Sequence, residues 1–389
     1  MKILKSHLKS FIKQEITDHE LSNLLHQLGH ENEFNNKSFD LDITPNRGDC
    51  LSVYGVARDL RNFLKVDLNL DIYQKEIDQL DLNFINNSPA QCPNISFLKI
   101  EVEHIKKNYK PYMEKFFTEL EVKRNNFFTD ISNYLSYEIG QPTHCFDFSK
   151  INGQISLEET NVSEEFNTIL GSKITISDSN LVFLNQDSII SLAGVMGGEE
   201  TGCSGETRMA LVECAYFLPE SIIGKSIKYN LKSDAAHKFE RGTDPNFHNF
   251  ALRRFLKIVE DHAKIVKVSI FSDNKNETKE ISIENDLKKV ESILGSSVSE
   301  DNFKTYLENL DFKVGNFIVP PSYRSDIVNL NDVTEEVARV IGYDSIERKD
   351  FQINITKNSE FRKEINNLKA FLIDKGFYEV ISFPFSHKE

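Results

Sequence analysis

The feature that most constrains the fold is a change of hydrophobic periodicity that occurs twice along the chain. Near the N-terminus, apolar residues recur at helical spacing after a capping-box pattern at Thr17 and Glu20. From about Ile95, short runs alternate apolar and polar residues, as strands do, and helical spacing returns near Ile281. A doubly wound sheet requires strict alternation of strands and helices, so this pattern instead predicts a multidomain α+β protein.

Segments between the periodic runs divide the chain further. We expect residues 30–38 to be a structureless bridge, residues 67–93 to be a linker and a strand to end at Pro45. The other expected elements are helices over residues 113–120, 245–264, 287–294, 303–310, 332–341 and 359–375, and strands from 317 and from 376. Because this last strand would start without a partner, we expect the chain to be truncated.

Composition limits the class of protein. A chain of 389 residues predicts two to four domains, and its formal net charge of −14 disfavours a general nucleic-acid or DNA binder. Five scattered cysteines form no C-x-x-C pair, which indicates a reducing compartment, the cytoplasm. No apolar run approaches the roughly 20 residues that span a bilayer, so we expect no membrane association.

One motif indicates a pocket, although each part of it alone has an ordinary structural explanation. A single loop histidine such as His144 in GQPTHCFD usually has a structural role, and a functional role requires a second polar group nearby. Glu213 in LVECAYF is a carboxylate in an apolar strand, where it is unfavourable unless it is paired or functional. The residues alone therefore allow a His/Glu hydrolytic or binding pocket.

Three other motifs have open interpretations. In DITPNRGDC we expect a turn in which Asp49 caps a helix and Arg47 forms a surface ion pair. SLAGVMGGEETG lacks the lysine of a phosphate-binding loop, and is either a tight strand bend or a close approach of backbone to a ligand. In RSDIVNLNDVTEE, Asp332 and Glu335 fit the N-cap and N3 positions of a helix, or the carboxylates hold Mg²⁺.

Taken together and in this order, the motifs resemble the β subunit of bacterial phenylalanyl-tRNA synthetase. The segments that carry the resemblance are DITPNRGDCLSVYGVARDL, DISNYLSYEIGQPTHCFD, SLAGVMGGEE, LVECAYF, LKSDAAHKFERGTDP and PPSYRSDIVNLNDVTEEVARVIGYD. The resemblance implies a split N-terminal B1-like domain over residues 1–90 and a B3/B4-type tRNA-editing domain over 91–268. It also implies a small helical, winged or helix-turn-helix-like B5 domain over 277–348 and the start of a truncated catalytic-like module over 356–389.

The resemblance also implies a substrate for the pocket, which is tyrosine wrongly attached to tRNA(Phe). Ser132, Asn133, Pro142 and His144 would form one wall, and Ala193 and Gly194 would supply close backbone. Glu213 would bind the tyrosyl hydroxyl, and Ser233 and Ala235 would complete the rim. His144, Asn133 and Glu213 are the expected catalytic residues. The family commonly has threonine where this chain has Ser132 and Ser233.

Partners and cofactors follow from the same resemblance. The subunit would pair with a catalytic α subunit in an α2β2 assembly, bind tRNA(Phe) and leave ATP to the α subunit. Mg²⁺ would be held by Asp326, Asp332, Glu335 and Glu336. The OB-fold tRNA-binding insert of the family is expected to be absent, as only the bridge 30–38 stands in its place. Two alternatives remain, a freestanding hydrolase acting in trans and a non-enzymatic assembly scaffold.

Overall fold

The computed structural model describes residues 1–161, 163–274, 280–347 and 360–384. The chain forms two compact units, Met1–Ile346 and Glu347–Glu389. Within the described ranges, no helix is both long and apolar enough to cross a membrane. The expected multidomain α+β class is confirmed by the arrangement of sheets and helices in the first unit.

The N-terminal part packs helices against a small antiparallel sheet. Its elements are β1 (Lys2–Leu4), α1 (Lys5–Phe11), α2 (Asp18–Gln27), β2 (Glu31–Phe34), β3 (Ser38–Asp42) and α3 (Val53–Asp59), with sheet order β1-β3-β2. The predicted capping box exists, because the Thr17 hydroxyl accepts from the Glu20 amide and the Glu20 carboxylate accepts from the Thr17 amide.

The bridge expected to be structureless is instead a β-hairpin, so that prediction was wrong. The side-chain carbonyl of Asn35 accepts from the amides of Lys37 and Ser38, which closes the turn between β2 and β3. Phe34 and Phe39 then face each other across the two strands with ring centroids 5.4 Å apart. Asn-rich composition does not show that the side chain of Asn35 closes a turn.

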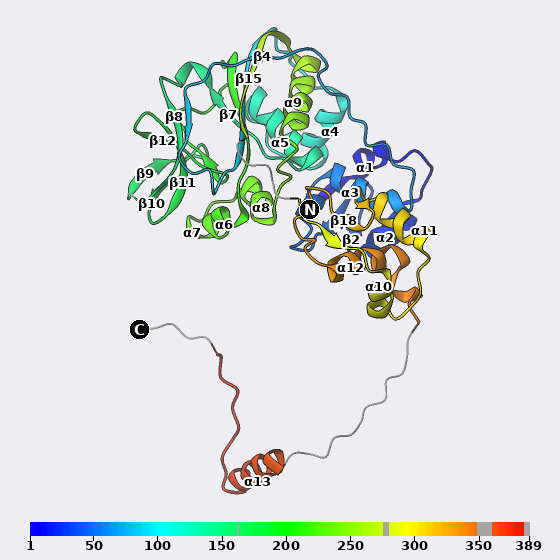
Figure 1. Cartoon of the computed structure of the whole chain (residues 1–389). Helices are drawn as coiled ribbons and strands as arrows, with labels where there is room; N and C mark the ends of the chain where they lie inside the picture. The colour runs from blue at the N-terminus through cyan, green and yellow to red at the C-terminus, as the bar shows by residue number, and fades with distance from the viewer. Residues whose placement is uncertain (162, 275–279, 348–359, 385–389) are drawn as a thin grey trace. The chain divides into compact units, whose positions relative to one another are not determined.

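The central part is an antiparallel sheet covered by helices on one face. Its strands, in order, are β4 (Asp78–Gln79), β15 (Lys264–Asn274), β6 (Asn94–Glu103), β14 (Met209–Tyr216) and β7 (His144–Asp147), with the edge strand β4 parallel to β15. The covering helices are α4 (Pro111–Glu119), α5 (Phe127–Ile139) and α9 (His248–His262), seen beside β7 and β15 in Figure 1.

A second sheet covers the opposite face. Its strands, in order, are β13 (Met196–Gly197), β12 (Ser188–Leu192), β11 (Asn180–Asn185), β8 (Ile155–Thr160) and β5 (Phe84–Asn86). A hairpin of β9 (Glu164–Asn167) and β10 (Lys173–Ile176), and the helices α6 (Pro219–Ile222), α7 (Lys225–Lys228) and α8 (Asp234–Arg241), complete this side. β4 and β5 lie inside the expected linker, which therefore contributes an edge strand to each sheet.

Alternation along β14 decides which side chains enter the space between the two sheets. Ala210, Val212 and Cys214 belong to the core under the helices, whereas Leu211 and Ala215 belong to the core between the sheets. Successive strand residues point to opposite faces. Glu213 therefore shares the inter-sheet face with Leu211 and Ala215.

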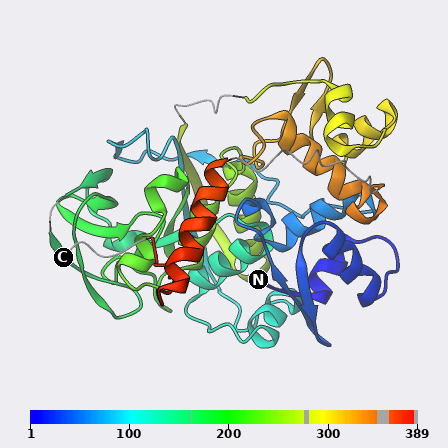
Figure 2. The same cartoon turned by 90° about the horizontal axis from the view of Figure 1, so that it is seen from below.

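The third part of the first unit has its own small core. Its elements are β16 (Ile283–Glu284), α10 (Leu287–Leu294), α11 (Glu300–Glu308), β17 (Lys313–Val314), β18 (Phe317–Val319) and α12 (Leu330–Ile341), with sheet order β16-β18-β17. Val290, Phe303, Leu307 and Val337 form the centre of this core. Seen from below in Figure 2, the orange α12 segment adjoins the blue N-terminal part of the chain.

In the second unit, the predicted helix is present as α13 (Glu360–Asp374), with Ile365, Leu368 and Phe371 on its apolar positions. The strand predicted from residue 376 does not form over residues 376–384, and residues 356–359 and 385–389 of the expected module lie outside the described ranges. A strand that has no neighbouring strand leaves its backbone N–H and C=O groups without hydrogen-bond partners in the protein.

Candidate functional site

A cavity of about 720 Å³ is bordered by α5, β7, β14, the turn into β13 and the start of α8. Most residues expected in the pocket line this one cavity. They are Ser132, Asn133, Pro142, His144, Gly194, Glu213, Ser233 and Ala235. The geometry therefore brings together side chains that are spread over about a hundred positions of the sequence.

Two of these residues, His144 and Glu213, are direct partners across neighbouring antiparallel strands. Glu213 is 5% exposed and forms no ion pair with any described residue. Burial raises the pKa of Glu213 to about 8 and lowers the pKa of His144 to about 4. At neutral pH both side chains are therefore predominantly uncharged, and they lie side by side on the inter-sheet face.

The glycine-rich turn fixes the ring of His144. A Cβ atom at Gly197 would lie 2.1 Å from Cε1 of His144, so the ring packs directly on backbone. The Nε2 atom of His144 is buried there without a hydrogen-bond partner among the described residues. His144 begins strand β7, so its expected place in a loop was wrong. The tight bend read from the glycine cluster is present as the turn of residues 193–195 between β12 and β13, whereas approach of the backbone to a ligand stays a prediction.

Ser132 and Asn133 follow each other on α5 but face different surroundings. The Ser132 hydroxyl donates to the carbonyl of Thr143 at 2.6 Å and lies 2.8 Å from the Thr143 hydroxyl. It thereby holds the segment of Pro142 and Thr143 against the helix. The Asn133 side chain forms no hydrogen bond with the described residues and is partly exposed in the cavity. Asn133 is thus free to bind a ligand, whereas Ser132 supports the wall.

The opposite rim is tied together by Ser233. Its hydroxyl donates to the Val195 carbonyl at 2.6 Å and accepts from the Ala236 amide, so it caps α8 and fastens the glycine-rich turn. Gly194 has a φ of +67°, a conformation that favours glycine. Ala193 lies just outside the cavity lining, is 1% exposed and donates its amide to Leu181. Its amide is therefore not available to a ligand.

Gly197 and Thr143 were not among the expected site residues, and Gly197 supports a first prediction. Gly197→Ala is expected to destabilise the fold by about 1–3 kcal/mol, because the added methyl group would displace a packed ring. Urea denaturation measures this change. Gly205→Ala is the matched control, since Gly205 borders the same cavity with open space around its Cβ position. Equal midpoints for the two variants would show that the His144 ring is not held by Gly197.

The raised pKa of Glu213 predicts a pH-dependent stability. Between its ordinary value of 4.5 and about 8, the folded chain holds a proton on Glu213 that the unfolded chain has lost. The free energy of unfolding must therefore fall as pH rises through this window. Glu213→Gln removes this ionisable group. The free energy of unfolding of the variant should therefore rise relative to that of wild type as the pH increases from 5 to 8.5. A difference that stays constant over this pH range in urea titrations would contradict the assignment.

The four carboxylates expected to bind Mg²⁺ are not gathered by the structure. Asp326 pairs with Arg324, and the two oxygens of Glu336 accept from Arg324 and Arg339 at 2.8 and 2.6 Å. Asp332 accepts from the backbone amides of Val328 and Asn329, and Glu335 is exposed. Among the described residues, no three of these carboxylates have oxygens within 4.8 Å of one another. As arranged here, they do not fit the ion, and the magnesium site stays a prediction.

The helix start itself differs from the expected one. Asn329, rather than Asp332, is the N-cap of α12, and its side chain accepts from the Asn331 and Asp332 amides. Asp332 takes the N3 position of the capping box that was assigned to Glu335. Both Asn and Asp are good N-caps, so residue type alone could not choose between them.

The carboxylate arrangement leads to a prediction for metal binding. Millimolar Mg²⁺ is expected to leave the thermal midpoint of the chain unchanged, because two of the four carboxylates already neutralise arginines. Differential scanning fluorimetry with and without Mg²⁺ tests this. A rise that disappears in Asp332→Asn would show that the four residues rearrange around the ion in the isolated chain.

The turn predicted in DITPNRGDC is present at the exposed residues Pro45 and Asn46, but Arg47 is buried, so the prediction of a surface ion pair was wrong. Arg47 is 4% exposed, and donates to Asp49 and Asp59 at 2.9 Å each. Arg339 of α12 forms a two-bond ion pair with Asp59 at 3.0 and 3.1 Å, and His30 contacts the same carboxylate at 2.9 Å. Asp49 therefore binds arginines instead of capping a helix.

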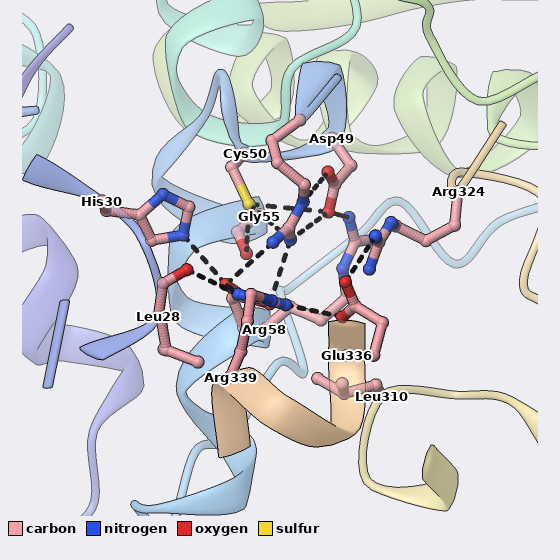
Figure 3. A network of polar contacts seen from close by, with 12 residues as sticks. Leu28, His30, Asp49, Cys50, Gly55, Arg58, Leu310, Arg324, Glu336 and Arg339 are labelled. Carbon is pink, nitrogen blue, oxygen red and sulfur yellow. Dashed lines mark hydrogen bonds and ion pairs between the residues drawn. The ribbon is translucent and has the colours of Figure 1, made fainter. Parts of the chain in front are cut away.

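Figure 3 shows this network, in which Arg339, Glu336 and Arg324 approach the N-terminal side chains from α12 and the loop before it. Burial opposes ionisation of Asp59, but Arg339 and Arg47 hold the pKa of Asp59 well below its usual range. His30, Cys50 and Asp59 also place potential metal-binding atoms within 4.8 Å of one another. Two arginines on the Asp59 carboxylate make that cluster a poor site for a cation.

Two family models match the chain. The B3/4 domain model matches residues 92–264, which include the cavity residues, and the tRNA synthetase B5 domain model matches residues 283–343. The first match spans the two facing sheets from β6 to the start of β15, and the second spans the small helical part. The fold and site thus define a tRNA synthetase polypeptide with B3/4 and B5 domains.

Curated relatives identify the family. The phenylalanine–tRNA ligase beta subunit of Francisella tularensis is 31% identical over 359 residues, which cover 89% of this chain and 45% of that protein. The Dickeya dadantii subunit of the same name is 29% identical over 370 residues, covering 91% and 46%. The chain belongs to the phenylalanine–tRNA ligase beta subunit family, and it spans about half the length of these relatives.

A solved structure was also matched. It is an N-terminal fragment of the phenylalanyl-tRNA synthetase beta-subunit from Pyrococcus horikoshii. The match covers 87% of this chain and 99% of that fragment. Its TM-score is 0.47 and its sequence identity is 14%. This structural similarity is too low to support the family assignment.

Proposed function

We propose that this chain acts within the beta subunit of phenylalanine–tRNA ligase and hydrolyses tyrosine wrongly attached to tRNA(Phe) in the cavity between the two sheets. The observation that supports this most strongly is the pair of His144 and Glu213, which are in register on adjacent strands, with Glu213 buried and His144 half-buried in the cavity wall. A buried carboxylate without an ion-pair partner is unfavourable to the fold, which is typical of a functional site.

Glu213 would select the misattached amino acid by its phenol. An apolar synthetic site rejects an added hydroxyl by only about a hundredfold, so tyrosine enters by error. A pKa near 8 keeps Glu213 a neutral carboxyl group at pH 7, which can donate one hydrogen bond and accept another. Tyrosine would satisfy this group, whereas phenylalanine would leave it buried and unpaired.

His144 and Asn133 would orient the ester and the attacking water. The water oxygen adds to the ester carbonyl carbon, the bond from that carbon to the ribose oxygen breaks, and the ribose oxygen takes up a proton that the attacking water has lost. A pKa near 4 makes His144 a neutral hydrogen-bonding group at pH 7 rather than a strong base. The unpaired amide of Asn133 can donate to the carbonyl oxygen as negative charge develops there.

The proposal includes partners. We infer from the family that a catalytic α subunit performs the ATP-dependent charging of tRNA(Phe) in the cytoplasm, and that this chain supports it. The proposed domain limits are those given by the motifs: 1–90, 91–268 and 277–348, with a further module over 356–389. Residues 275–279 and 348–359 lie outside the described ranges.

Incubating the chain with Tyr-tRNA(Phe), with and without a cognate α subunit, tests this proposal. Release of tyrosine together with formation of a stable complex with α is the expected outcome. Release without complex formation would favour a freestanding hydrolase acting in trans. Complex formation without release of tyrosine would favour an assembly scaffold and overturn the hydrolytic role.

A further inference from the structure

A second cavity, of about 620 Å³, adjoins the first one and shares part of its wall. The shared lining residues are Ser132, Asn133, Pro142, Thr143, Asp234 and Ala235. The remaining walls come from β1, the segment after β3, α4 and the C-terminal half of α8. The two cavities therefore adjoin along a wall that includes Asn133.

The second cavity contains a buried cation, Lys238, which is 8% exposed. Its ammonium group donates to the carbonyl and the hydroxyl of Ser136 and forms no ion pair with any described residue. An ammonium group has three N–H donors, so one of them has no described partner. A buried charge without a counter-ion is unfavourable unless a ligand supplies that counter-ion.

Two further cations and two carboxylates line the cavity around Lys238. Lys2 and Arg241 also line the cavity, and Arg241 keeps one of its nitrogens on the carbonyl of Ile43. Two carboxylates, Asp42 and Asp234, are on the rim and are exposed. Of these charged groups Lys238 alone is buried, and it has no counter-ion among the described residues, as a group that contacts a phosphate requires.

We propose that the second cavity binds a backbone phosphate of the single-stranded RNA 3′ end whose terminal ester occupies the first cavity, with Lys238 contacting that phosphate. The inference rests on the proposed function for the ester. The chemistry is consistent with the geometry, because the nucleotide that precedes the terminal ribose is joined to it by a phosphodiester. An extended strand that leaves the ester would pass Asn133 and meet Lys238 next.

The test uses two non-hydrolysable probes with tyrosine in amide linkage: the 3′ end of a CCA trinucleotide, and adenosine alone, which has no phosphate. The full chain is expected to bind the trinucleotide about tenfold more tightly than the adenosine probe. Lys238→Gln should remove most of that difference without changing the binding of the adenosine probe. Lys238→Arg should keep it, and Lys264→Gln, on an exposed lysine outside both cavities, should match wild type.

Salt dependence gives a second readout that does not require a variant. Wild-type affinity for the trinucleotide should fall with salt with a slope of about 0.7 per phosphate contacted, and affinity for the adenosine probe should not. Equal binding of both probes by wild type, or equal loss of both in Lys238→Gln, would overturn the inference. Phosphate-dependent binding without hydrolysis of Tyr-tRNA(Phe) would instead leave this inference standing and refute the proposed function.

Discussion

The variant Glu213→Ala is expected to lose about a hundredfold of the preference for Tyr-tRNA(Phe) over Phe-tRNA(Phe) in deacylation. The reason is that the carboxyl group is the one described group on the inter-sheet face of β14 that can pair with the phenol hydroxyl. In the alanine variant, both amino acids would meet an apolar wall, so the penalty against phenylalanine disappears. Rate constants for both substrates, measured under single-turnover conditions, give the ratio.

Two controls make this result specific. Glu213→Gln keeps a neutral side chain that donates and accepts hydrogen bonds, so it should retain much of the preference. Glu206→Ala removes an exposed carboxylate outside the cavity lining and should leave both rates unchanged. If Glu213→Ala keeps the wild-type ratio, Glu213 does not select the substrate.

Asp59→Ala is expected to destabilise the first unit by about 3–5 kcal/mol, since it leaves Arg47 and Arg339 buried without their shared carboxylate. Urea denaturation measures the loss. The surface pair of Asp67 and Lys13, at 3.2 Å, provides the comparison, because Asp67→Ala should cost no more than about 1 kcal/mol.

Asp59→Ala should also loosen the contact between the N-terminal part and the B5 part. Asp59 closes α3, and Arg339 lies on α12, 280 positions later, so the ion pair joins the N-terminal part to the B5 part. Amides of α12 should therefore exchange faster with deuterium in Asp59→Ala, whereas those of α9 should change little. A mutant cycle with Arg339→Met should show strong coupling, and additive losses would mean that the two side chains act independently.

Local patterns located several helices, although they misassigned the N-cap of α12, and they did not indicate the buried networks. The capping box at Thr17 and the apolar spacing of α9 each depend on neighbours within a few residues, and both predictions were confirmed. The environment of Arg47 depends on Asp59 and Arg339, which the sequence does not place near it. An ion pair predicted for the surface therefore proved to be the centre of a buried network.

For the cavity, too, the sequence indicated individual residues but not how they pair. Alternation could indicate that Glu213 and His144 each lie on a sheet face, but the register that makes them partners is a property of the assembled strands. The packing of His144 on Gly197 brings together β7 and β13, which belong to different sheets. Motif resemblance named eight of the residues that line the cavity, whereas the supporting role of Ser132 required its contact with Thr143.

The hydrolytic role of the cavity is tested most directly by the rates at which the wild-type chain releases amino acid from Tyr-tRNA(Phe) and from Phe-tRNA(Phe), each compared with spontaneous hydrolysis. We expect rapid release of tyrosine, and release of phenylalanine close to the spontaneous rate. Equal acceleration of both, or acceleration of neither, would contradict the claim that the cavity around His144 and Glu213 removes misattached tyrosine.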